Sequence, residues 1–218
     1  MILSKQILAV TFSCLAILFL AKSVSAQQTT QPQRNITLPQ GEVVEGDYFA
    51  AGDTVTLSGT VNGDAYLAGG RIIVQGTVNG DVLAAGGQIT VSGDVSEDVR
   101  VAGGQITFSG TVGDSFSAAG GQVELTEGAT VGGNTAVASG NFNTYAPIQG
   151  GLALAAGQAT IGDFIGNGVR AFVGQLLVTP SAVISGDLVY WSETQADIQQ
   201  GASIQGEITR RDPPQYAQ

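Results

Sequence analysis

The sequence predicts an all-β protein, a single-stack parallel β-helix (β-solenoid) with coils of about 17 residues. Valine recurs every seventeen residues, at Val44, Val61, Val78, Val95 and Val112. The rest of the unit repeats with it, as in VNGDAYLAGGRIIVQGT followed by VNGDVLAAGGQITVSGD. A short fixed period with no helical stretch inside it is typical of a solenoid, where each repeat is one coil stacked on its neighbour.

Each coil is expected to hold three short strands around an aliphatic interior. In the first coil, Val55 and Leu57 flank the polar Thr56, which is the pattern of a half-buried strand. A second strand carries Tyr48 and Ala50, and the valine column opens a third. Three sides joined at corners predict a coil of roughly triangular section.

Paired glycines recur at 69–70, 86–87, 103–104 and 120–121. Glycine at one place in every coil predicts a corner that needs a positive φ or a close backbone approach, which a Cβ would oppose. These glycines are therefore assigned to architecture rather than to phosphate binding.

The period loosens after Gly128, where we interpret Ala129-Thr130 as a two-residue insertion. The I/V-x-G-D element of the early coils is expected to return, with isoleucine in first place, at 161–163, 184–187 and 204–207. We infer one continuous solenoid domain over residues 44–209, with about eight or nine coils.

The two ends of the chain differ from the repeats. Residues 1–26 have a basic start, an apolar run over 7–21 and a small-residue site ending at Ala26, which predicts a cleaved secretory signal peptide. Residues 27–43 are interpreted as a flexible lead-in and residues 210–218 as a polar tail. The predicted location is the periplasm, the cell envelope or the exterior. Cys14, the only cysteine, lies in the leader, so no disulfide is expected.

The charge balance excludes several partners and reactions. The chain has 218 residues and a formal charge of −10, and both lysines lie in the leader. A strongly acidic chain argues against nucleic acid or an anionic lipid surface as partner. The absence of histidine excludes histidine bases, Ser/His nucleophile pairs and histidine zinc sites.

The columns V-x-G-D-x-x-x-A-G-G-x-I-T-V-x-G resemble the bactofilin, or polymer-forming cytoskeletal, family from Val44 to about Thr209. The segment from Ala182 to Gly206, with its Tyr190-Trp191 pair, resembles the last coils of envelope proteins of this type. The resemblance implies a right-handed parallel β-helix that polymerises end to end without nucleotide. The export signal sets this chain apart from the best-known members, which are cytoplasmic.

An acidic column, Asp47, Asp64, Asp81 and Asp98, is the sharpest polar feature, with Asp53, Asp94 and Asp114 nearby. Stacked carboxylates repel unless a cation lies between them, so a calcium ladder is one hypothesis. The unit lacks the nonapeptide of known calcium-binding solenoids. We favour the alternative, that each aspartate follows glycine at a turn and bonds to backbone, and we assign no metal site.

Other polar columns are also given structural roles. Asn62 and Asn79, like Gln88, Gln105 and Gln122, are expected to form amide ladders. Threonine columns suggest an ice-binding face, but Ile73, Asp94 and Glu124 interrupt them. Arg71 and Arg100 lie on different columns, which argues against a polysaccharide-cleaving site. We assign no catalytic or cofactor-binding residue and expect no enzyme.

The expected function is structural: an exported rod that self-associates end to end or scaffolds the cell envelope. A solenoid end exposes unpaired N–H and C=O groups, which are a template for pairing with another copy. The alternative is a monomeric binding module for an envelope glycan or an envelope membrane protein. Tyr190-Trp191 is its best candidate surface, because adjacent strand residues face opposite ways and one must point outward. We favour the alternative that the aromatic residues fill the wider terminal coils, because terminal repeats are usually atypical and capping.

Overall fold

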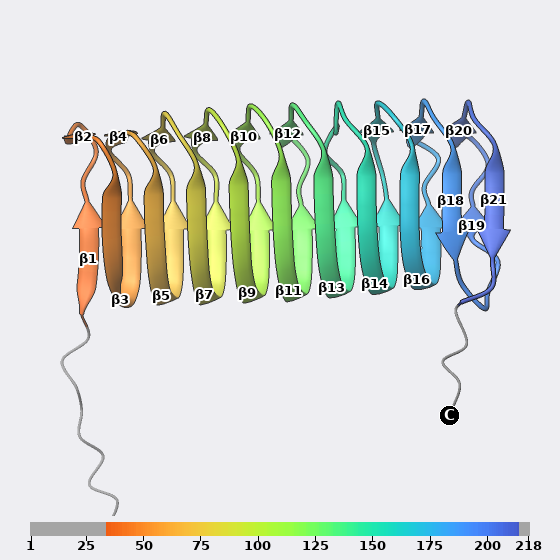
Figure 1. Cartoon of the computed structure of the whole chain (residues 1–218), viewed down its shortest axis with the longest axis horizontal. Helices are drawn as coiled ribbons and strands as arrows, with labels where there is room; N and C mark the ends of the chain where they lie inside the picture. The colour runs from red at the N-terminus through yellow and green to blue at the C-terminus, as the bar shows by residue number, and fades with distance from the viewer. Residues whose placement is uncertain (1–33, 214–218) are drawn as a thin grey trace, which may run out of the picture. The chain divides into compact units, whose positions relative to one another are not determined.

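The computed structural model describes residues 34–213 and confirms the β-solenoid, with about ten coils. Within this range every regular element is a strand, and strands one coil apart pair in parallel, side by side in chain order (Figure 1). No helix in this range is long and apolar enough to cross a membrane. The predicted signal peptide with Cys14, residues 27–33 of the lead-in and residues 214–218 of the tail lie outside the described residues.

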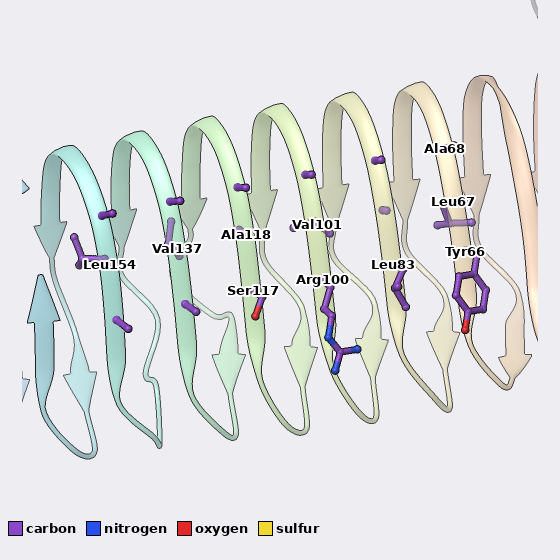
Figure 2. A pocket seen from close by; sticks show the side chains of 18 of the residues that line it. Tyr66, Leu67, Ala68, Leu83, Arg100, Val101, Ser117, Ala118, Val137 and Leu154 are labelled. Atoms are coloured by element: carbon purple, nitrogen blue, oxygen red, sulfur yellow. The ribbon is translucent and has the colours of Figure 1, made fainter. Parts of the chain in front are cut away.

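Each internal coil has one ten-residue strand, which takes in two of the three strands expected from the columns. The strand bends part-way along its length, as Figure 2 shows, and inward residues lie at its first, third, eighth and tenth places. These long strands are β3 (Tyr48–Leu57), β5 (Ala65–Val74), β7 (Val82–Val91), β9 (Val99–Phe108), β11 (Phe116–Leu125), β13 (Thr135–Thr144), β14 (Leu152–Ile161) and β16 (Val169–Val178).

The third side of each coil is a short strand, as predicted from the valine column. These strands are β2 (Val43–Glu45), β4 (Thr60–Asn62), β6 (Thr77–Val78), β8 (Asp94–Val95), β10 (Thr111–Val112), β12 (Thr130–Val131), β15 (Phe164–Ile165), β17 (Val183–Ile184) and β20 (Ser203–Ile204). Single bridges from Ile148 to Val131 and Ile165 join the six-stranded and three-stranded sheets. One column therefore runs from Val44 to Ile204.

The solenoid extends beyond the boundaries expected from the sequence. On the N-terminal side, β1 (Asn35–Leu38) and β2 lie within coils, because Ile36 and Leu38 continue the apolar columns of Val55 and Leu57. On the C-terminal side, β18 (Leu188–Trp191), β19 (Asp197–Ile198) and β21 (Ile208–Arg211) complete the stack. The lead-in and the tail thus both contribute strand residues.

The interior is a stack of aliphatic side chains, broken by a few aromatic ones. The largest fully buried side chains include Phe108, Phe116 and Phe142. Phe108 and Phe116 contact each other with ring centroids 5.0 Å apart. Because each coil adds one residue to every column, burial follows directly from the seventeen-residue period.

The glycine pairs serve a close backbone approach, and positive φ plays no part there. The described glycines with positive φ are Gly41, Gly46, Gly128 and Gly201, none of which belongs to a pair. A Cβ on Gly69 would lie 2.6 Å from the Gly52 carbonyl oxygen of the coil before it. Glycine is therefore required because adjacent coils nearly touch at the bend.

The two-residue insertion precedes the place assigned to it. Thr130 pairs in register with Thr111, so it belongs to the ordinary coil. The extra residues fall in the turn at Glu127 and Gly128, where Gly128 has a φ of 87°. Glycine adopts this left-handed conformation without the steric cost of a Cβ.

The coils after residue 141 are more regular than the sequence analysis inferred. Ile161 ends the long strand β14, and its Gly-Asp successor is not the repeated element. The true counterpart of Ile184 is Ile165, with which it pairs. With that register, 141–178 holds ordinary coils, and the count rises from eight or nine to about ten.

Candidate functional site

The acidic column forms a ladder of hydrogen bonds between coils. The Oδ1 atom of Asp81 accepts a hydrogen bond of 2.9 Å from the backbone amide of Asp98. The same bond repeats from Asp64 to Asp47, from Asp81 to Asp64 and from Ser115 to Asp98, with lengths of 3.1, 2.9 and 2.7 Å. The carboxylates thus bond to backbone, as expected, but to that of the next coil rather than to their own turn.

The outer oxygens of the ladder are engaged by two side chains. Arg100 forms ion pairs with both Asp81 and Asp98, and the Tyr66 hydroxyl donates to Asp64 Oδ2 at 3.1 Å. Burial acts to raise the pKa of Asp81, but the Asp98 amide and the Arg100 guanidinium outweigh it, so this pKa lies below its ordinary value. The hydrogen bond to Asp64 raises the pKa of the Tyr66 phenol.

Within residues 34–213, no three aspartate, glutamate, histidine or cysteine side chains gather into a group that could hold a metal ion. Of the outlying carboxylates, Asp53 Oδ2 accepts from the Arg34 amide at 2.9 Å and so ties the first coil to the second. The ladder bonds give the acidic column a structural explanation that needs no cation.

The amide columns are partly confirmed as ladders. Asn79 donates to Asn62 at 2.8 Å, and Asn62 donates in turn to Glu45 at 3.0 Å. A similar pair joins Gln158 and Gln175 at 3.3 Å. The structure gives no hydrogen bond among Gln88, Gln105 and Gln122. Amide ladders therefore form on the short side and at one pair of the glutamine column, whose members Gln105 and Gln122 face solvent.

An open apolar groove of about 1,160 Å³ crosses the outer face of the large sheet from β3 to β16. Figure 2 shows rows of side chains along it, with Ala68 near the bend and Tyr66, Leu83, Arg100 and Ser117 lower down. The alanine row is Ala51, Ala68, Ala85, Ala102, Ala119, Ala138 and Ala155. Since alanine barely rises above the backbone, this part of the sheet is hollow.

Stacked aromatic rings stand at both ends of the groove. Phe49 and Tyr66 stack with centroids 4.7 Å apart and planes 5° from parallel. Phe172 and Trp191 stack at 4.3 Å and 9°, with the Arg211 guanidinium 5.3 Å from the Trp191 ring. Phe49 is 70% exposed, so this end of the groove presents an aromatic ring to solvent.

The prediction for Tyr190 and Trp191 is confirmed, because the two side chains face opposite ways. Tyr190 is 3% exposed and belongs to the core, where its hydroxyl accepts a bond of 3.2 Å from the Ala196 amide. Trp191 lies on the outer face. The groove was not predicted from the sequence, because the column of alanines indicates it only once the bend of the strand is known.

The two ends of the stack expose core columns. Buried hydrophobic residues fill the middle coils, whereas seven apolar residues of the terminal coils are only partly buried: Ile36, Val44, Tyr48, Ala196, Ile198, Ala202 and Ile204. Ile208, whose neighbour Leu188 in the same column is fully buried, is 49% exposed. These residues face outward along the stack because no described coil covers them.

Comparisons with protein-family models, curated proteins and solved structures find no match to this chain. The ladder, the groove and the two ends are the features of the described residues that bear on function.

Proposed function

We propose that this protein is a non-enzymatic structural component that self-associates through the ends of its solenoid. The observation that carries the proposal is that apolar core columns reach the surface at both ends, beside strand edges that no described strand covers. Exposed apolar residues beside unpaired backbone groups are a template for pairing with another chain.

The proposed setting is the cell envelope or the exterior. It rests on the predicted leader at 1–26, on the acidic composition, and on the resemblance of the columns to a polymer-forming family. A stack held by coil-to-coil hydrogen bonds also suits an exported protein without disulfides, since its stability comes from packing and stacking.

The second candidate is a monomeric binding module, favoured by the apolar groove with its aromatic ends. Planar aromatic faces bind apolar faces of ligands, and Trp191 and Phe49 lie on the outer surface. In this alternative the groove takes up a glycan or a segment of an envelope protein. The two candidates place function on different residues, so one experiment separates them.

The test follows the molar mass of the purified protein by light scattering over a concentration series, with negative-stain microscopy of the same samples. Ile198→Asp with Ile204→Asp places charges on exposed core columns of the C-terminal end and should abolish association. Phe172→Ala with Trp191→Ala removes an aromatic pair of the groove and should leave association intact. A far-ultraviolet circular dichroism spectrum checks that both variants keep their strands. A wild-type protein that stays monomeric at every concentration contradicts the proposal and directs attention to the groove.

A further inference from the structure

The N-terminal end of the solenoid is only half covered. Internal long strands pair along their whole length on both sides, but β1 pairs only with Thr54–Leu57, the second half of β3. Among residues 34–213, no strand lies against the outer edge of the first half, Tyr48–Ala51. The end of the stack is therefore a step, raised over one half of the coil and open over the other.

The C-terminal end is half covered in the opposite sense. There β18 and β19 together occupy the two halves of a long strand, since both pair with β16. β21 then covers β18 alone. Within the described part of the chain nothing pairs with the outer edge of β19, so this end is raised over the first half and open over the second.

We infer that these two steps are halves of one joint, in which β21 of one copy and β1 of the next copy build a single composite coil. β21 fills the place open over Tyr48–Ala51, and β1 fills the place open over β19. This inference rests on the proposed self-association, and it specifies the partner as a second copy and the polarity as head to tail. It also fixes the register, because β21 and β1 occupy known places in the coil.

The register continues the apolar columns across the joint. The third-side column, which ends at Ile204 in one copy, resumes at Val44 in the next. Leu38 lies over Ile198, because both occupy the tenth place of the long strand. Ile208 lies under Tyr48 at the first place. The joint thus covers apolar residues that the single chain leaves partly exposed at both ends.

The polar ladders also find partners at the joint. In the last coil Asp187 Oδ1 accepts from the Glu207 amide at 2.8 Å, which is the ladder bond of the acidic column. Glu207 therefore occupies the position of the next carboxylate of the ladder. In the joint, this carboxylate would accept a hydrogen bond from the backbone amide of Asp47 of the next copy. On the short side, the amide of Gln205 can donate a hydrogen bond to the carboxylate of Glu45 of the next copy.

Arg210 departs from the pattern of the columns that meet at the joint. It follows Tyr190 in an inward column, yet its guanidinium turns to donate to the carbonyl oxygens of Ser192 and Glu193, both at 3.1 Å, and pairs with Asp212 at 3.6 Å. The Arg210 guanidinium thus already has hydrogen-bond and ion-pair partners within the single chain. A charged residue at an inward place of a terminal strand weakens edge pairing, so the joint is weaker than an internal coil contact.

Cysteine cross-linking tests polarity and register together. Thr37 and Asp197 occupy the same outward place on β1 and β19, so the joint sets them on neighbouring strands about 4.8 Å apart. That spacing lies within the Cα separation of a disulfide. The protein is expressed from its full reading frame with Cys14→Ser, so that the introduced cysteine is the only thiol. Thr37→Cys and Asp197→Cys proteins are mixed and oxidised, and Gln199→Cys replaces Asp197→Cys as the register control.

The expected result is a disulfide between the Thr37→Cys and Asp197→Cys proteins, little with Gln199→Cys, and none when either protein is oxidised alone. Light scattering under reducing conditions, run in parallel, shows whether the variants associate. Association with disulfides inside the single-variant samples means like ends meet, and association without the Thr37–Asp197 disulfide means the register is wrong. Either result overturns the composite coil and leaves self-association standing. Absence of association at all concentrations overturns both proposals.

Discussion

The hydrogen-bond ladder at Asp81 gives the sharpest stability prediction. The Asp81 carboxylate accepts a hydrogen bond from a backbone amide of the next coil and also forms an ion pair with Arg100. Asp81→Ala leaves the Asp98 amide without its 2.9 Å acceptor and removes one of the two carboxylates around Arg100. Losing the acceptor of a partly buried donor costs about 1–3 kcal/mol. The Asp81 side chain is 21% exposed, so water replaces part of the bond and we expect about 1.5 kcal/mol.

Asp81→Asn distinguishes the contribution of the hydrogen bond to stability from the contribution of the charge. The amide keeps an Oδ1 acceptor for Asp98 and relieves repulsion along the acidic column, so we expect a loss of less than about 0.5 kcal/mol. The matched control is Asp94→Thr, which places in an exposed position the residue that Thr77 and Thr111 supply in neighbouring coils. Free energies of unfolding come from urea titration followed by circular dichroism, with chelator in a parallel series.

The pH dependence of Asp81 has a fixed sign. The pKa of Asp81 in the folded protein lies below the ordinary value of 3.8. The ionised carboxylate therefore contributes fully to folding stability above that value, and this contribution is lost as the pH falls through the lower pKa of the folded state. The stability difference between the wild type and Asp81→Asn should therefore shrink on acidification below about pH 4. Equal stabilities of Asp81→Ala and the wild type at pH 7 would refute the ladder. A large loss of wild-type stability in chelator would favour a bound cation instead.

Three further substitutions, and one matched control, test the packing and the joint. Gly103→Ala places a Cβ 2.6 Å from the Gly86 carbonyl oxygen and should lower the free energy of unfolding, measured by urea titration, by about 2 kcal/mol. The control Gly46→Asn changes a glycine with positive φ whose Cβ would lie in open space, and it should lower the free energy of unfolding by less than about 1 kcal/mol. Phe142→Ala empties a fully buried site and should cost about 3–5 kcal/mol in the same assay. Arg210→Leu should lower the concentration at which the protein associates by about tenfold, as read by light scattering, because it removes a charge from the composite coil. An unchanged or higher association concentration would place Arg210 outside the joint.

The period predicted the fold because a solenoid repeats the same environment in every coil. Val44 and its successors form one column of the structure. The aspartates form a second column, and the paired glycines form columns of their own. Each sequence column became a structural column wherever the spacing stayed at seventeen. The boundaries were harder to place, because the terminal coils carry only part of the pattern: Ile36 and Leu38 continue two columns, but Gln33 and Arg34 do not look like a repeat.

Three features depended on geometry that spacing does not encode. Ile161-Gly162-Asp163 matches the repeat in sequence, yet Ile161 belongs to the end of a long strand and Ile165 to the short side. The groove depends on the height of side chains above a bent sheet, and alanine at one column shows it only once the bend is known. The acidic ladder was assigned to turns, because stacking distances between coils do not follow from sequence order.

The half-covered ends explain why self-association here would be ordered. A flat solenoid end would pair with any exposed edge in several registers, since parallel strands offer equivalent bonds along their length. A step admits only a partner with the opposite step, and this chain carries both, at β1 and β21. Association also has to overcome about 4–15 kcal/mol of lost translational and rotational freedom, which an internal coil contact does not. With Arg210 in the composite coil, the joint gains less than an internal contact to offset that cost. Assembly through this joint should therefore be reversible and dependent on concentration, while each copy remains a folded unit.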